Sequence, residues 1–353
     1  MGVFDEMARL GHEQVTFCYD RVTGTRAIIA IHDTALGPAR GGTRLRPGAS
    51  ESAALGEALE LSAAMTTRLA MGGLPRGGGR AVLLGADGVD RAAMLRVYGR
   101  FVELLGGRFG TGPDLGLDDA DLAEVASQTR WAWPASTAGD PVVLAARAVA
   151  AGVAVAVQEA FGSPELAGRR VLVAGLAGVG GELAGLLARA GATVLGWDSN
   201  ADRAEAVAGR LGIELVSPGA WDTECDVLCP CTGGAGLTGE VVERLRCRVV
   251  AGSGSGQLGG PADARRLHER GILWAPEHVM GAAAPWAVVG AGELGWSATR
   301  LAESAEVVAA ALRAVFRRAT AEGLTPGEAA DLIAAERVTA AARVRALTGP
   351  PEV

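Results

Sequence analysis

The chain has 353 residues, which is long for one ordinary domain and sufficient for two domains that each bury a core. Apolar residues make up 49% and charged residues 21%, and the net charge of -7 excludes a general electrostatic attraction to nucleic acid or to an anionic membrane. All 33 basic residues are arginines, so mechanisms that need a lysine amine as base, nucleophile or Schiff-base former are excluded. We therefore expect a globular protein that binds a small molecule, with no nucleic-acid partner and no membrane partner.

The sequence contains no targeting signal or cysteine motif that indicates a function. The N-terminus lacks the basic start and apolar core of a secretory signal, and no apolar run of about 20 residues is free of Gly, Pro and charge. These absences predict a cytoplasmic protein. The five cysteines form no Cys-x-x-Cys pair and lack clustered histidines, so we predict no metal site. Cys229 and Cys231 flank Pro230 on an expected strand, and we interpret both as small buried residues.

Residues 1–138 alternate short apolar runs with helical stretches. Residues 27–31 and 81–84 are typical of strands, whereas residues 51–65 and 90–105 are typical of helices. The stretch 131–141 is rich in Pro, Ser, Thr and Gly, which indicates an interdomain connection. We predict an α/β substrate and oligomerisation domain over residues 1–138, followed by an Ala- and Val-rich helix over residues 142–161.

The next part of the chain has the order of a doubly wound α/β domain. A strand over residues 169–174 leads into a glycine-rich turn, a helix, and a second strand over residues 192–198. Further strand candidates at 226–229, 248–251 and 272–274 alternate with helices, which predicts a parallel sheet. We therefore expect a Rossmann-type NAD-binding domain over residues 139–321, and we expect the last helices, about 322–353, to pack back on the first domain.

The glycine-rich turn indicates a dinucleotide site. Such a turn presents backbone N–H groups and a helix N-terminus to a pyrophosphate, and an acid at the end of the next strand accepts hydrogen bonds from the adenosine ribose. Asp198 is that acid and favours NAD over NADP. Ala177 replaces the middle glycine, so a methyl group lies where backbone approaches phosphate. The alternative is a glycine-rich turn that holds no ligand. The predicted cofactor residues of the turn are Gly175, Ala177, Gly178, Val179 and Gly180.

Several motifs resemble the leucine, valine and phenylalanine dehydrogenases of the Glu/Leu/Phe/Val dehydrogenase family. They are residues 17–20, 27–34, 36–44, 73–80, 114–116, the dinucleotide unit, 230–231, 251–253 with 257–258, and 275–277. The resemblance covers nearly the whole chain. It implies that an N-terminal substrate domain and a C-terminal NAD domain flank a cleft, where a hydride passes between the amino-acid α-carbon and the nicotinamide. It also implies a homo-oligomer built through the N-terminal domains, and cofactor contacts from Cys231, Thr232 and Ser253.

The resemblance places the chemistry on three residues. In the family one lysine binds the substrate carboxylate, a second activates water, and an aspartate shuttles protons. These positions fall on Arg68, Arg80 and Asp114 of this chain. The Arg68 fork suits a carboxylate because it binds both oxygens. Arg80 is unsuited to act as a general base, because a guanidinium stays protonated far above working pH. Further substrate-binding positions are Gly41, Gly42 and Met65.

Other positions also depart from the family pattern. The substrate-holding asparagine falls on Gly281, the threonine near the nicotinamide amide falls on Ala145, and the paired asparagines beside the cofactor fall on Ser255 and Gly256. Arg40 replaces an apolar residue that shapes the side-chain pocket, which argues against leucine or valine as substrate.

We expect four arginines and one acid to share the cleft. Arg40, Arg68, Arg76 and Arg80 beside Asp114 would suit an anionic or multiply carboxylated ligand. The alternative is that Arg40 and Arg76 point to solvent.

Two aromatic side chains lie near the same predicted cleft. His278 supplies titratable chemistry in the place of a lysine, or is a satisfied structural group. Trp286 follows an inserted-looking stretch over residues 282–285, and it stacks on a ligand or simply packs.

Three functions remain open. The first is an NAD(H)-dependent oxidoreductase that acts on an amino, imino or keto acid by a changed mechanism, such as reduction of a preformed imine with Asp114 or His278 as proton donor. The second is a non-catalytic relative that binds NAD, an amino acid or a partner. The third is an ordinary branched-chain or aromatic amino-acid dehydrogenase in which Arg80 serves as the base.

Overall fold

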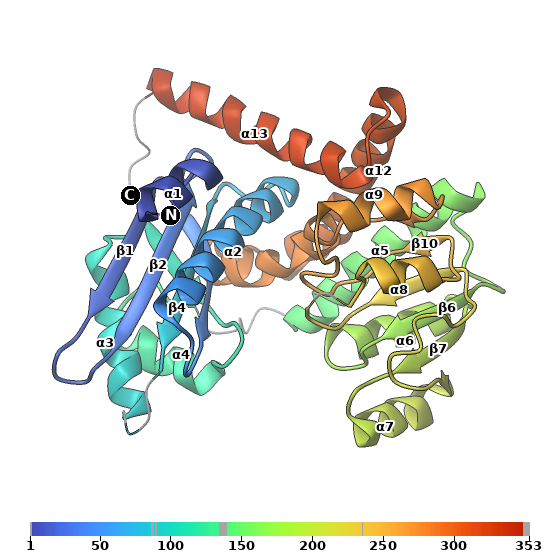
Figure 1. The fold of residues 1–353 in the computed structure, drawn as a ribbon, viewed down its shortest axis with the longest axis horizontal. Coiled ribbons are helices and arrows are strands. Elements are labelled where there is room, and N and C mark those ends of the chain that lie inside the picture. The colour runs from blue at the N-terminus through green and yellow to red at the C-terminus, as the bar shows by residue number, and fades with distance from the viewer. Residues whose placement is uncertain (1, 86–87, 89, 134–139, 235, 349–353) are drawn as a thin grey trace. The chain divides into compact units, whose positions relative to one another are not determined.

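The chain forms two compact units, shown in Figure 1. The computed structural model describes residues 2–85, 88, 90–133, 140–234 and 236–348. Unit 1 comprises residues 1–138, 285–297 and 334–353, and unit 2 comprises residues 139–284 and 298–333. These units depart from the expected boundaries in two places, because residues 285–297 belong to unit 1 and residues 322–333 to unit 2. The expected connection over 131–141 lies partly outside the described residues.

Unit 1 contains a five-stranded mixed sheet in the order β1-β2-β4-β3-β5. Strand β2 pairs antiparallel with both β1 and β4, whereas β3 pairs parallel with both β4 and β5. The elements are α1 (Val3–Leu10), β1 (Gln14–Tyr19), β2 (Arg26–Asp33), β3 (Ala39–Leu45), α2 (Glu51–Met71), β4 (Gly77–Leu84), α3 (Arg91–Leu104), β5 (Phe109–Gly112), α4 (Asp119–Ala126) and the π-helical η2 (Trp286–Glu293).

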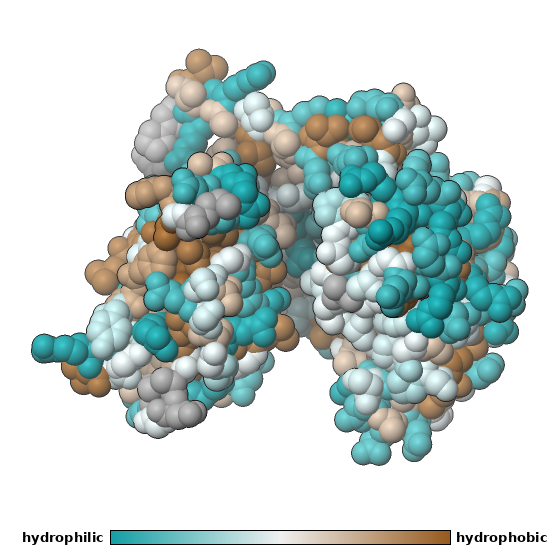
Figure 2. Space-filling model, viewed as in Figure 1, coloured by the Kyte–Doolittle hydropathy of each residue, from teal (hydrophilic) through white to brown (hydrophobic). Residues whose placement is uncertain are grey.

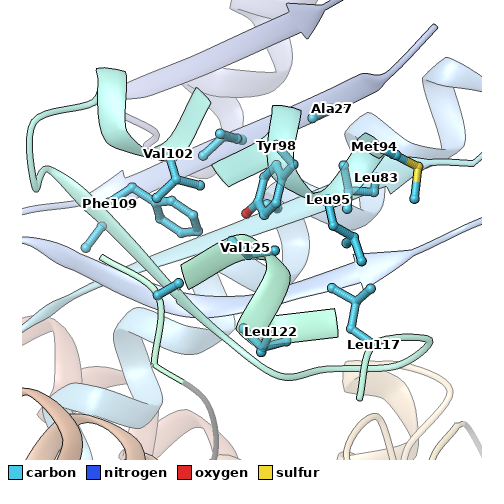
Figure 3. Close-up of a cluster of buried hydrophobic side chains, with 14 of the residues drawn as sticks. Ala27, Leu83, Met94, Leu95, Tyr98, Val102, Phe109, Leu117, Leu122 and Val125 are labelled. Carbon is cyan, nitrogen blue, oxygen red and sulfur yellow. The ribbon is translucent and has the colours of Figure 1, made fainter. Parts of the chain in front are cut away.

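The two faces of this sheet are buried by different helices. Alternate residues of β2 and β4 point to opposite faces, as strand geometry requires. Ile29 belongs to one cluster of buried side chains. Figure 3 shows other members of this cluster: Leu83 of β4 and Phe109 of β5 lie with Tyr98 of α3 and Leu122 of α4. Ile28, Val82 and Leu84 lie in a second cluster with residues of α2. Because both faces are covered, polar side chains on these strands meet a largely dry environment.

Helix α2 is longer than the predicted helix and brings a site residue into place. Ser50 caps its N-terminus by accepting a hydrogen bond from the Ala53 N–H. The helix continues from Glu51 to Met71, so Arg68 lies in its last turn.

Unit 2 contains a six-stranded, wholly parallel sheet in the order β11-β10-β9-β6-β7-β8. This is the doubly wound order in which the direction of winding reverses between the first and fourth strands, here β6 and β9. The prediction of a Rossmann-type domain is confirmed. The elements are α5 (Pro141–Phe161), β6 (Arg170–Ala174), α6 (Val179–Arg189), β7 (Thr193–Trp197), α7 (Ala201–Leu211), β8 (Glu214–Leu215), β9 (Val227–Pro230), α8 (Gly239–Arg244), β10 (Val249–Val250), α9 (Pro261–Glu269), β11 (Leu273–Trp274), α10 (Glu277–Met280), η1 (Gly281–Ala283), α11 (Ala298–Ala302) and α12 (Ser304–Glu322). The division between the units falls inside α13 (Pro326–Thr348).

Helix α5 is long and apolar enough to cross a membrane by length and composition, but it serves as a core helix of unit 2. Half of its most apolar window is buried, and it packs against α6 and α12.

The surface differs between the units. Apolar residues gather on the visible face of unit 1 around β1, where Phe17 and Tyr19 are exposed (Figure 2). Hydrophilic residues cover much of the visible face of unit 2 around α8 and α9 (Figure 2).

Candidate functional site

In unit 1, Arg80 and Asp114 form an ion pair beside the parallel strands. Arg80 lies on β4, Asp114 follows β5, and the Arg80 Nη1 donates to Asp114 Oδ2. Arg44, on β3, donates from Nε to Asp114 Oδ1 at 3.2 Å and from Nη1 to Glu57 Oε1 at 2.7 Å. The Asp114 carboxylate is therefore held as an anion between two guanidinium groups, and its side chain is 16% exposed.

Arg68 belongs to the same cluster. Burial and the charges of Arg44 and Arg68 lower the pKa of Arg80 to about 9, whereas the charge of Glu57 acts in the opposite direction. Arg80 remains charged at neutral pH in either case. Arg44 and Arg80 contact Asp114, Arg44 also contacts Glu57, and the charge of Arg68 acts on Arg80, so the three guanidinium groups exceed the two carboxylates by one positive charge, which suits an anion.

Two glycines allow this cluster to form against the sheet. A Cβ on Gly42 would lie 2.8 Å from Arg80 Nη1 and 2.9 Å from the Pro113 carbonyl oxygen. A Cβ on Gly41 would lie 1.7 Å from the Gly79 carbonyl oxygen, so only glycine permits this approach of β3 to β4. Because neither glycine carries a side chain, the backbone of β3 leaves space for the Arg80 side chain. Met65, the other predicted substrate position, is partly buried on α2, three residues before Arg68.

Arg40 and Arg76 form a separate cluster around Glu293. Arg40 donates from Nε and Nη2 to the two Glu293 carboxylate oxygens at 2.8 and 2.6 Å, and Arg76 approaches Glu293 Oε1 at 3.0 Å. The Arg40 guanidinium also lies 5.0 Å from the ring centroid of Trp133 and 5.9 Å from that of Trp131. The alternative in which Arg40 and Arg76 point to solvent is wrong, because both guanidiniums are paired with Glu293 and Arg40 is only 3% exposed. Both guanidinium groups share one counterion, the Glu293 carboxylate of η2.

Trp286 packs within unit 1. It is 3% exposed, its Nε1 donates to the Gly72 carbonyl oxygen at 2.9 Å, and its ring meets that of Trp296 edge to face. Of the two expectations for Trp286, the packing one describes these contacts.

In unit 2, the glycine turn has the backbone that a pyrophosphate cradle needs. Gly175 has φ +96° and Gly178 has φ +47°, conformations that side-chain-bearing residues rarely adopt. A Cβ on Gly180 would lie 1.9 Å from the Gly175 carbonyl oxygen, so the third glycine lets α6 approach β6. Gly178 begins α6 without any side-chain cap, and Ala177 is exposed at the turn. These residues fit a dinucleotide phosphate at the helix N-terminus.

The predicted residues from β9 and the loop after β10 reach the same end of the sheet. The Cys231 N–H donates to the Ala174 carbonyl oxygen at 2.7 Å, and a Cβ on Gly175 would lie 2.7 Å from Thr232 Cγ2. Ser253 hydrogen-bonds with Cys231. All of them lie at the point where the strand order reverses, which is where ligands bind in such sheets. Cys229 is buried, but Cys231 is only partly buried, so the prediction that both are buried is wrong for Cys231.

Asp198 lies directly after β7 and is 3% exposed. Its Oδ2 accepts from the Leu176 N–H at 2.8 Å and from Arg203 Nε at 3.0 Å. Its Oδ1 accepts from the Asn200 N–H at 2.9 Å and from Arg203 Nη2 at 2.6 Å. The Arg203 hydrogen bonds, followed by those of the backbone, lower the pKa of Asp198 far below its usual range.

His278 lies on α10 and contributes to a cavity of about 270 Å³ within unit 2. Its Nε2 is 3.7 Å from Asp331 Oδ1, and Glu277, Glu328 and Arg265 line the same cavity. Of the positions expected to depart from the family pattern, Gly256 lines this cavity, Gly281 begins η1, and Ala145 is buried on α5, all within unit 2.

Sequence reasoning missed four charged residues that complete these clusters. Arg44 follows Gly42 by two residues, so strand alternation indicates that both share one face. Arg203 follows Asp198 by five residues and lies in the first turn of α7. This spacing could have indicated that Arg203 lies close to Asp198. Glu57 and Glu293 carried no local signal.

Comparisons with known proteins agree over nearly the whole chain. Residues 12–131 match the family described as Glu/Leu/Phe/Val dehydrogenase, dimerisation domain. The chain is 37% identical to leucine dehydrogenase of Thermoactinomyces intermedius, over 96% of this chain and 94% of that protein. It is 39% identical to valine dehydrogenase of Streptomyces coelicolor, over 94% of this chain and 93% of that protein. The crystal structure of L-tryptophan dehydrogenase from Nostoc punctiforme superposes with a TM-score of 0.86 at 32% identity, covering 96% of this chain and 99% of that one.

Proposed function

The chain belongs to the Glu/Leu/Phe/Val dehydrogenase family, and from this premise we propose that it is an NAD(H)-dependent oxidoreductase acting on an amino, imino or keto acid. The observation that carries the proposal is the Arg44–Asp114–Arg80 cluster with Arg68 beside it. It combines an anionic proton acceptor with cations that can hold a carboxylate. The named substrates of the relatives support an amino acid or the corresponding keto acid as ligand.

Each residue of the cluster has a distinct proposed role. Arg68 binds the substrate carboxylate through its paired N–H donors. Gly42 leaves room for the substrate above Arg80 and Asp114. Asp114 exchanges the proton, because it is the acid of the cluster that follows a strand end beside Gly42. Arg80 orients Asp114 and stabilises negative charge, but it does not act as the base. The bound nicotinamide would supply or accept the hydride.

The cofactor is proposed to bind at the end of the unit 2 sheet where Gly175, Gly178 and Gly180 form the cradle. Cys231, Thr232 and Ser253 would line its nicotinamide side, as the family resemblance implies. His278 is proposed as an alternative proton donor, and its cavity position supports this role.

A first experiment tests nucleotide binding by fluorescence titration, and then turnover with imino and keto acids. We expect micromolar binding and a reaction that Asp114→Asn reduces by at least a hundredfold, because the amide cannot exchange the proton. Glu124→Gln, at a partly exposed ion pair in the same unit, is the control. An Asp114→Asn rate equal to that of the unaltered chain would contradict the role of Asp114.

A non-catalytic function is the second candidate. It is favoured by the saturation of both acids, since Asp114 is engaged by two guanidiniums and Asp198 by one. Restoring lysine at both Arg68 and Arg80 separates the two functions. Recovered amino-acid oxidation would show that the remaining pocket is intact and that only the base was lost.

We also propose that the protein assembles as a homo-oligomer through unit 1. The exposed apolar residues Phe17 and Tyr19 on the edge strand β1 support this assembly. The hetero-hexameric glutamate dehydrogenase from Thermus thermophilus, in its Leu-bound form, is an assembled relative, with a TM-score of 0.76 at 25% identity over 95% of this chain and 90% of that one.

A further inference from the structure

All the acceptor positions of Asp198 are occupied in the structure. A carboxylate offers about four acceptor positions on its two oxygens. Four N–H groups fill them: Leu176 and Asn200 from the backbone, and Nε and Nη2 from Arg203, at distances of 2.6 to 3.0 Å. The two hydroxyls of an adenosine ribose also need this carboxylate as their acceptor. They therefore compete with groups that already hold it.

Only one of these donors can withdraw without unfolding local structure. The Leu176 N–H is part of the glycine turn, and the Asn200 N–H lies directly before α7, whose N-terminus the Asn200 side chain caps. The Arg203 side chain is 41% exposed, whereas the carboxylate it covers is 3% exposed. Arg203 thus lies across the route by which a ribose reaches Asp198, and it can swing into solvent.

We infer that Arg203 decides which nicotinamide dinucleotide this chain binds, and that the chain accepts NADP(H) at least as tightly as NAD(H). The inference rests on the proposed cofactor site. A guanidinium presents two parallel N–H donors to phosphate oxygens, so a 2′-phosphate can take Arg203 as its partner. A ribose 2′-hydroxyl offers Arg203 only a neutral acceptor, and it must displace Arg203 to bind Asp198. This inference is opposite to the prediction from the sequence that Asp198 favours NAD over NADP.

The charge at the site agrees with this assignment. The hydrogen bonds from Arg203 and from the backbone keep Asp198 ionised at neutral pH. An ionised carboxylate without a counterion would repel a 2′-phosphate, and Arg203 neutralises that charge. Removing Arg203 should therefore weaken NADP(H) binding for two reasons. The 2′-phosphate loses its guanidinium partner, and the negative charge of Asp198 is left unneutralised beside it.

The test is titration of the full chain with NADPH and with NADH, in which binding is monitored by nucleotide fluorescence and by calorimetry. Titrations with 2′,5′-ADP and 5′-AMP serve as probes that lack the nicotinamide. For the unaltered chain we expect a Kd for NADPH no larger than that for NADH. Arg203→Ala should raise the NADPH Kd at least tenfold, which is about 1.4 kcal/mol, without raising the NADH Kd. The matched control is Arg210→Ala, which removes an equal charge from an exposed side chain on the same helix and should change neither Kd by more than about twofold.

A second variant tests the inference by changing the acid that holds Arg203. Asp198→Asn weakens the hold on Arg203, so NADH binding should fall while NADPH binding stays or improves. Equal losses for both nucleotides would contradict the inference, provided that circular dichroism shows a folded chain. If NADH binds tenfold more tightly than NADPH and Arg203→Ala leaves that ratio unchanged, the inference is overturned and the proposed oxidoreductase function stands. Binding of neither nucleotide to the folded chain would overturn both.

Discussion

Glu293 is the shared counterion of Arg40 and Arg76, and its removal should destabilise unit 1. The Arg40 and Glu293 side chains are only 4% and 11% exposed. Breaking a buried ion pair by removing one partner costs about 3–5 kcal/mol, because the remaining charge is left buried. For Glu293→Gln we expect the lower end, about 3 kcal/mol, because Arg40 keeps the carbonyls of Ala39 and Gly107 and the ring of Trp133. For a domain of 150–250 residues this loss lowers the melting temperature by about 6–12 °C.

The measurement is urea and thermal unfolding followed by tryptophan fluorescence, which senses Trp131 and Trp133 beside Arg40. Glu124→Gln is the control in the same unit, because its ion pair with Arg96 is 40% exposed on both sides and should be worth less than about 1 kcal/mol. Arg40→Met and the double variant complete a double-mutant cycle, with an expected coupling of about 2 kcal/mol. A Glu293→Gln chain as stable as the control, or additive effects in the cycle, would refute this reasoning.

Three further predictions use other positions. Burial lowers the pKa of His12 to about 4, so the unfolded chain binds more protons between pH 6.5 and 4, and stability should fall as pH decreases through that window. His12→Gln should reduce this loss by about 1–2 kcal/mol, after allowance for partial exposure, in urea titrations at pH 7 and pH 4.5. Gly42→Ala should displace Arg80 and raise the KM for the acid substrate at least tenfold, with an unchanged circular dichroism spectrum; an unaltered KM would remove Gly42 from the substrate site. Gly180→Ala should abolish nucleotide binding or folding, because its Cβ would lie 1.9 Å from the Gly175 carbonyl oxygen, and normal titration curves would contradict the cradle.

Local patterns predicted the elements well where a single physical signal decides them. The apolar run at 27–31 lies within β2, Arg26–Asp33, and the helix expected at 51–65 starts at Glu51 behind its Ser50 cap. That helix ends six residues later than predicted. Its last turn, Thr66–Met71, is half polar in sequence and is stabilised by tertiary packing, since Gly78 of β4 lies directly against Thr66.

Some features of the candidate site were also predictable from local sequence, whereas others depended on tertiary packing. The succession of strands along the chain, the glycine turn and the acid Asp198 are predictable from the sequence, because φ angles, burial and backbone hydrogen bonds constrain residue types at fixed spacing. The proximity of Arg68, Arg80 and Asp114 was expected from the family resemblance. In unit 1 Arg80 and Asp114 form an ion pair, and the charge of Arg68 acts on Arg80.

The sequence by itself thus determined the fold class, the absence of lysine and the position of the glycine-rich turn. Only the tertiary structure decided how the arginines are paired: Arg40 with Glu293, which is 253 residues away, and Arg203 with the acid expected to bind the ribose. The physical reason is that a long charged side chain reaches several partners, and its choice depends on which carboxylate the fold buries beside it. Periodicity in the sequence records which face of an element is buried, but it does not record that choice.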